Sequence, residues 1–179
     1  MKASWLVLAM AALTASCATT PSSPLQTVAR VEVERYTGTW HEVALYPNRF
    51  QQSCASDTTA TYTLLGDGRL GVLNRCRRSD GSEISVDGVA EIVDPATNAK
   101  LKVSFLPGWL RWTGIGWGDY WVLYLSPDYR VAIVGEPSRE YLWILARTPT
   151  LPDTEYEALL AKVRAAGYDP DRLRRAAPR

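Results

Sequence analysis

The feature that most constrains the fold of this 179-residue chain is a series of eight short apolar segments, each ended by turn residues. Segments of this length and spacing predict antiparallel strands of an all-β domain. Gly66-Asp67-Gly68 predicts a tight hairpin after the second strand, and Gly88 predicts a kink or bulge in the fourth. The expected strands are residues 38–46, 58–65, 70–76, 82–93, 100–105, 120–125, 130–135 and 141–147.

A change of period follows the last strand. Apolar side chains then recur at helical spacing, at Tyr156, Leu159, Leu160 and Val163. The expected helix covers about 153–166, because Pro152 and Asp153 suit a first turn and Gly167 suits an end. Eight such strands and one helix predict an eight-stranded antiparallel up-and-down β-barrel, at about 38–147, with the C-terminal α-helix packed outside it.

The N-terminus predicts export and lipidation. Residues 1–16 form a signal peptide pattern, whose apolar run is too short to span a bilayer. Two small residues before Cys17 resemble the lipobox of bacterial lipoproteins, although Thr14 stands where Leu is usual. The resemblance implies a lipid on Cys17, and Ala18 after it implies the outer membrane; ordinary cleavage, which releases a soluble periplasmic protein, is the alternative. We expect residues 17–30 to form a flexible tether and residues 31–179 the folded domain.

The cysteine count predicts a disulfide. If Cys17 carries lipid, Cys54 and Cys76 remain as a pair in an oxidising compartment. Strand directions place both at the same end of the barrel, and the bond is worth roughly 3 kcal/mol by loop closure. Two buried free thiols are the alternative. A metal site is not expected, because the chain has one histidine.

Composition and motifs exclude several function classes. The formal net charge is +1 without a basic stripe, so nucleic acid is not an expected partner. His41 is expected on the outer face of its strand, and no Gly-x-Ser-x-Gly motif is present. We therefore expect neither an enzyme nor a bound cofactor. The seven Trp and nine Tyr fit either core packing or an aromatic-lined cavity and a lipid-facing surface.

Three motifs in order carry a family resemblance. Gly38-Thr39-Trp40 begins the first strand, Asp119-Tyr-Trp-Val-Leu123 opens the sixth, and Tyr141-Leu-Trp-Ile-Leu-Ala-Arg147 forms the eighth. From about Val31 to Tyr168 the chain resembles the lipocalin family, most closely its bacterial outer-membrane lipoprotein branch, although the usual Thr-Asp-Tyr of the second motif is absent. The resemblance implies binding of fatty acids or lysophospholipids, maintenance of envelope lipids, and a periplasm-facing lipid anchor. A homodimer stays open.

Strand directions also predict how one end of the barrel is closed. The first strand begins, and the eighth ends, at the same end of an up-and-down barrel, and the two are neighbours when it closes. Arg147 is therefore expected over the indole of Trp40, beside Gly38, in a contact worth about 0.5–2 kcal/mol. Separate packing of the two side chains is the alternative.

Strand alternation predicts the ligand-binding residues. The expected inward-facing set is Glu42, Ala44, Tyr62, Leu64, Leu73, Phe105, Tyr120, Val122, Tyr124, Tyr141 and Trp143. A single bulge in the sixth strand would exchange its inward residues for Trp121 and Leu123. Glu42 is expected either as a hydrogen-bonded strut or as a contact for a ligand head group.

The loop after the fifth strand is expected at the mouth. Its tryptophans, Trp109, Trp112 and Trp117, either touch a membrane or partner or fold inward as a gate. Three alternatives to a lipid carrier stay open: a carrier of haem, quinone or carotenoid, a lipocalin-fold enzyme, and a structural lipoprotein whose barrel is filled.

Overall fold

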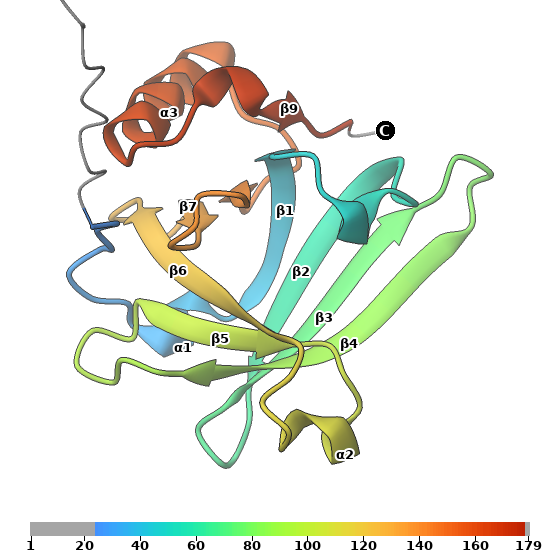
Figure 1. The fold of residues 1–179 in the computed structure, drawn as a ribbon. Helices are drawn as coiled ribbons and strands as arrows, with labels where there is room; N and C mark the ends of the chain where they lie inside the picture. The colour runs from blue at the N-terminus through green and yellow to red at the C-terminus, as the bar shows by residue number, and fades with distance from the viewer. Residues whose placement is uncertain (1–23, 178–179) are drawn as a thin grey trace, which may run out of the picture.

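A closed barrel dominates the computed structural model, which describes residues 24–177. Hydrogen-bonded neighbours follow the order β2-β3-β4-β5-β6-β7-β8-β1, and β1 also pairs with β2, so the sheet closes on itself (Figure 1). This confirms the expected eight-stranded antiparallel barrel with a C-terminal helix. The strands are β1 Gly38–Leu45, β2 Ser56–Leu64, β3 Leu70–Arg77, β4 Glu83–Ile92, β5 Lys100–Ser104, β6 Trp117–Leu125, β7 Val131–Gly135 and β8 Leu142–Ala146.

Short elements join or cover these strands. They are α1 Val33–Tyr36, η1 Arg49–Gln51, α2 Gly108–Arg111, α3 Asp153–Ala165, η2 Pro170–Arg172 and β9 Arg174–Arg175. The one-turn elements carry too few residues to show a period in the sequence. The sixth strand begins at Trp117, earlier than expected, because its first residues pair with β5 as far as Ser104. No helix in the described part of the chain is long and apolar enough to cross a membrane.

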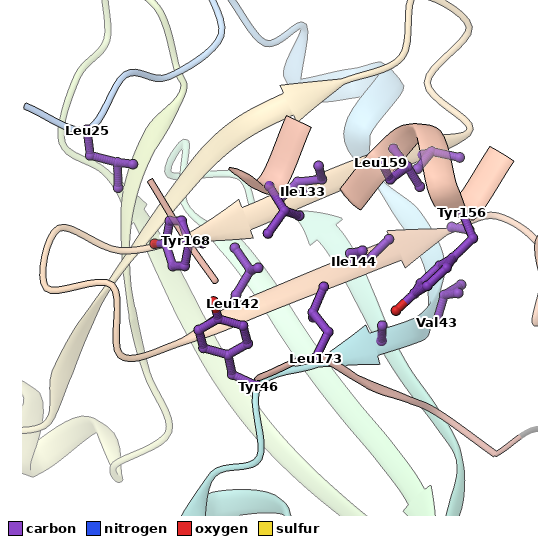
Figure 2. Close-up of a cluster of buried hydrophobic side chains, with 14 residues drawn as sticks. Leu25, Val43, Tyr46, Ile133, Leu142, Ile144, Tyr156, Leu159, Tyr168 and Leu173 are labelled. Carbon is purple, nitrogen blue, oxygen red and sulfur yellow. The ribbon is translucent and has the colours of Figure 1, made fainter. Parts of the chain in front are cut away.

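Helix α3 packs on the outside of the barrel. Its buried residues are Tyr156, Leu159 and Val163, which pack with the outward-facing side chains of β1, β7 and β8. Figure 2 shows Tyr156 and Leu159 in this position. We call this group of buried side chains the outer cluster. Burying each large side chain contributes about 1.5–3 kcal/mol, so the helix stabilises this wall.

The N-terminal segment is packed where the structure describes it. Leu25 joins the outer cluster, and the Val28 amide donates to the Val122 carbonyl at 2.9 Å. Residues 24–30 of the expected tether therefore lie against the barrel. The expected signal peptide, Cys17 and the rest of the tether lie outside the described residues.

A second, inner cluster fills one end of the barrel. It includes Trp40, Tyr62, Val72, Val122 and Leu145. We call this end, where β1 begins and β8 ends, the closed end. The opposite end, where the β1–β2, β3–β4, β5–β6 and β7–β8 connections lie, is the open end.

Two β-bulges correct the expected inward set. The β1–β8 register shifts between Glu42 and Ala44, and Ala44 then pairs with Ile144 of the outer cluster. An extra residue in one strand resets its alternation, so Ala44 faces outward while Glu42, opposite Leu145, faces inward. The expectation for Ala44 was wrong for this reason.

The second bulge lies in β6. The β6–β7 register shifts between Val122 and Tyr124, and Tyr124 then pairs with Ile133 of the outer cluster. Tyr120 and Val122 face inward as expected, but Tyr124 faces outward. Leu125 takes the next inward place, opposite Ala132 of the inner cluster.

Candidate functional site

The closed end is sealed by the expected pair. The Arg147 guanidinium lies 3.8 Å from the centroid of the fully buried Trp40 ring. Its Nη atoms donate to the carbonyls of Arg35, Thr37 and Thr39, each at 2.9 Å. Arg147 therefore joins the segment before β1 to the end of β8 and closes the barrel with one cationic side chain.

Gly38 has the backbone conformation that this closure needs. Its φ is +89°, and a Cβ there would lie 3.4 Å from Arg147 Nη1. A side chain would therefore add backbone strain and crowd the guanidinium.

Three tyrosine hydroxyls meet inside the barrel next to this seal. Tyr36 Oη lies 2.7 Å from Tyr120 Oη, and Tyr62 donates to Tyr120 at 2.9 Å. Burial raises the pKa of all three, that of Tyr62 to about 12, so they stay neutral. Two hydrogen bonds use two of three hydroxyl hydrogens, so the trio retains one donor. The interior next to the closed end is thus weakly polar rather than purely apolar.

Inward-facing apolar residues remain accessible nearer the open end. Val86 pairs with Asn74 and shares the inward alternation of Gly88 and Ala90 on β4. Its side chain is 43% exposed, and Phe105, which packs against Gly88, is 39% exposed. Solvent therefore reaches an apolar inner wall above a sealed end.

Gly88 makes room for Phe105. A Cβ on Gly88 would lie 2.6 Å from Phe105 Cδ1, and the pairing with β3 runs through Gly88 without a register shift. Of the expected kink or bulge at Gly88, the bulge is therefore absent. The glycine instead allows an aromatic ring to lie on the inner wall.

A hydrogen-bonded chain links three elements inside the open half. Gln51 of η1 donates from Nε2 to Glu42 Oε2 at 2.5 Å and accepts at Oε1 from Trp143 Nε1 at 3.0 Å. Asn48 holds this glutamine through a third bond, from Nδ2 to Gln51 Oε1 at 2.8 Å. Glu42 is thus a strut that holds the first loop against β1 and β8.

The Glu42 carboxyl has an unusual proton affinity. Burial raises the pKa of Glu42 to about 7, although the hydrogen bond from Gln51 lowers it in part. Sequence reasoning missed Gln51, because nothing in its neighbourhood marks it as part of the interior. Asn48 carried a usable signal, since Asn is a preferred N-cap and its side chain accepts from the Phe50 and Gln51 amides.

The expected disulfide joins Cys54 and Cys76, whose Cα atoms are 5.5 Å apart. Cys76 follows the inward alternation of Val72 and Asn74 on β3. The bond therefore ties the first loop to the rim of the open end.

Two expected lining residues lie elsewhere. Leu64 is 45% exposed at the closed-end hairpin, two pairs beyond Tyr62. Leu73 alternates with the inward residues Val72 and Asn74 and so faces outward, opposite Asp87. Leu64 has the inward parity of Tyr62 but lies past the barrel interior, at the end of its strand. The expectation for Leu73 failed because the parity of its strand was not anchored on a paired neighbour.

The remaining expected residues are near the mouth or in the wall. Tyr141 stacks on Trp143 with ring centroids 6.0 Å apart and lies 5.7 Å from Phe50. His41 pairs with Ala146 of the outer cluster and faces outward, away from Glu42. Sequence reasoning also missed Asn74, an inward residue whose Oδ1 is buried without a hydrogen-bond partner.

The loop after β5 holds its tryptophans differently. Trp109 and Trp112 are 72% and 83% exposed, so neither folds into the barrel as a gate. Trp117 is half-buried and donates from Nε1 to the Arg111 carbonyl at 3.1 Å. Trp117 therefore braces the loop, whereas Trp109 and Trp112 face solvent.

Comparison with known proteins agrees with this architecture. The Lipocalin-like domain model matches residues 31–178. The chain belongs to the lipocalin family. This lipocalin is 44% identical over 156 residues to temperature-induced lipocalin-1 of Arabidopsis thaliana, with 86% of this chain and 83% of that protein covered. It is 38% identical over 151 residues to outer membrane lipoprotein Blc of Escherichia coli K12, with 84% and 81% covered.

Solved structures share the fold of this lipocalin at low sequence identity. Insecticyanin from the tobacco hornworm Manduca sexta superposes with a TM-score of 0.66 at 20% identity, with 86% of this chain and 84% of that chain covered. This likeness shows the fold alone.

Proposed function

We propose that this lipocalin holds the acyl chain of a fatty acid or lysophospholipid in the open half of its barrel. The observation that carries the proposal is the exposed inner wall at Val86 and Phe105, above the end sealed by Trp40 and Arg147. The similarity to an outer membrane lipoprotein supports a setting in which such lipids are at hand.

The energetics suit a carrier that must also release its ligand. About fifteen buried methylenes yield roughly 12 kcal/mol at about 0.8 kcal/mol each. Association and ordering cost roughly 4–15 kcal/mol, which leaves an affinity near micromolar. No residue has to form a covalent bond for this task.

The anchor belongs to the same proposal. A lipid on Cys17 would place the protein at the periplasmic side of the outer membrane, where it takes part in maintaining envelope lipids. Members of the family are typically binders without enzymatic activity, and His41 is turned away from the interior, so we propose no catalytic role.

The first test identifies the ligand. Native mass spectrometry of the protein purified from its own membranes should show one co-purified fatty acid or lysophospholipid per barrel. A coloured protein that carries haem, quinone or carotenoid would replace this proposal with a different carrier. A barrel that binds none of these would contradict it.

The second test locates the ligand with matched variants. Val86→Trp fills the inner wall, whereas Asp87→Trp places the same side chain on the outer face of the same strand. We expect the first variant to bind a fluorescent acyl probe about tenfold or more weakly and the second to bind like the wild type. Equal binding by the two variants would refute a ligand in the open half.

A further inference from the structure

Asn74 presents an unusual polar group to the barrel interior. It lies on β3 with the inward alternation of Val72, and its Oδ1 is buried without a hydrogen-bond partner among the described residues. Its direct neighbours across the sheet are Ala60 and Val86, which carry no polar side-chain atom. A buried acceptor left without a donor is costly, so this oxygen calls for an explanation.

The register places Asn74 next to the three tyrosine hydroxyls inside the barrel. Tyr62 pairs with Val72, and Asn74 is two residues further along β3, so Tyr62 and Asn74 are diagonal neighbours on the inner face. Diagonal neighbours lie about 7–8 Å apart, within reach of an aromatic side chain. Because β3 runs from the closed end to the open end, a ligand that enters from the open end reaches Asn74 first and the hydroxyls next.

The hydroxyl cluster beyond Asn74 also has unused hydrogen-bonding capacity. Tyr36, Tyr62 and Tyr120 share two hydrogen bonds, at 2.7 and 2.9 Å, and retain one hydroxyl hydrogen. Tyr120 is partly exposed, and because it faces inward, its exposed part borders the barrel interior. One free acceptor and one spare donor therefore lie at neighbouring points of the inner wall.

No positive charge accompanies these polar groups. By strand alternation, every Lys and Arg of the described barrel strands faces outward, whereas the Glu42 carboxyl faces inward. An ionised acid or phosphate group would find no counter-charge beside Asn74, and burying an unpaired charge is very costly. The ionised head group of a ligand is therefore expected near the open end, and its chain beside Asn74.

We propose that Asn74 and the tyrosine hydroxyls bind a hydroxyl group carried on the acyl chain of the ligand, remote from its head group. A hydroxyl both donates and accepts, so it matches a free amide oxygen and a spare hydroxyl hydrogen. A keto group only accepts, and a methyl end does neither. The inference rests on the proposed acyl-chain site and names the class of chain that this site selects, with Asn74 as the specificity-determining residue.

The test compares dodecanoic, tetradecanoic and hexadecanoic acids with their ω-hydroxy derivatives. Each acid displaces a fluorescent acyl probe from the full chain in a Cys17→Ser background, so that no detergent competes for the barrel. In a purely apolar interior the hydroxyl would lose its bonds to water and weaken binding about tenfold or more. At the chain length that reaches Asn74, we expect this parent protein to bind the hydroxylated acid at least as tightly as the plain one.

Asn74→Leu keeps the approximate size of the side chain and removes its polar atoms. This variant should bind the plain acids like the parent and the matching hydroxylated acid about tenfold more weakly. Tyr120→Phe, which removes the hydroxyl that both other tyrosines contact, should change the ratio of the two affinities in the same direction. Arg75→Leu places the same new side chain on the outer face of β3 and should bind every acid like the parent.

The ratio of the two affinities is measured within each protein, and binding of the plain acid shows that the barrel is folded. Asn74→Leu and Tyr120→Phe alter different strands, so either one alone decides the question. Equal ratios in the parent and these two variants at every chain length would overturn the inference. Tenfold weaker binding of all hydroxylated acids by the parent would also overturn it while leaving the proposed function intact. A parent that binds no plain acid would refute the proposed function itself.

Discussion

Glu42 is a carboxyl group inside an apolar barrel, and its protonation affects stability in a direction that can be worked out. Its folded pKa of about 7 lies above the ordinary value of 4.5. Between these values the unfolded chain is ionised while the folded protein keeps the proton. The stabilising contribution is complete below pH 4.5 and is lost as the pH rises through about 7.

Glu42→Gln should remove this pH dependence. The amide cannot ionise and keeps a hydrogen-bonding partner for Gln51. Between pH 5 and pH 8 the wild-type free energy of unfolding should fall by about 2 kcal/mol more than that of the variant. Urea denaturation at the two pH values measures the difference, and parallel curves would show that Glu42 is ionised in the folded protein.

Arg147 stabilises the closed end through both its charge and its hydrogen bonds. Arg147→Ala removes the contact with Trp40, about 0.5–2 kcal/mol, and leaves three carbonyls without this donor. At about 1 kcal/mol for each of these three hydrogen bonds, the total loss should be about 3.5–5 kcal/mol. Chemical denaturation measures it. Arg130→Ala, which alters an exposed arginine nearby, is the control, and an equal loss in both variants would contradict the role of the seal.

Among the elements, α3 contributes to stability through the face that packs against the barrel. Leu159 is buried in the outer cluster, whereas Leu160 is only partly buried. Leu159→Ala should destabilise the protein by about 2–4 kcal/mol through lost burial and a cavity. Leu160→Ala should cost less than half as much. Thermal unfolding followed by circular dichroism compares the pair, and equal losses would show that the helix is not docked by this face.

At the scale of the whole molecule, the folded barrel and the proposed lipid anchor are separable. The sealed end, the disulfide and α3 all lie within the described residues, whereas Cys17 lies before them. Cys17→Ser should therefore leave the fold unchanged and move the protein from the membrane fraction to the soluble periplasm. Cell fractionation followed by an immunoblot measures this shift. A variant that stays in the membrane fraction would show that another feature attaches the protein.

Most of the architecture followed from local patterns. The eight strands, the period of α3 and the placement of Trp40 beside Arg147 depend on alternation, turn residues and the direction of successive strands. The Cys54–Cys76 pair followed from the cysteine count, and strand directions place both residues at one end of the barrel. These features need no knowledge of the distances between side chains.

The residues that line the inner wall could be predicted from the sequence only in part. Glu42, Tyr62, Tyr120 and Val122 face inward as the alternation predicts, but Ala44 and Tyr124 do not, because each follows a bulge. A bulge depends on how two strands fit together, and one extra residue reverses every later side chain. The role of Gln51 could not be predicted for a similar reason, since this loop residue contacts Glu42 and Trp143 only after the barrel has closed.

The sequence by itself determined that this chain forms a closed barrel with one end sealed by an arginine and with a helix outside. Alternation, turns and strand direction are local properties, and they leave one antiparallel arrangement. The tertiary structure decided which side chains form the interior, that Glu42 becomes a strut, and that Trp109 and Trp112 face solvent. These outcomes depend on bulges, loop conformation and burial, which arise only when distant segments pack against one another.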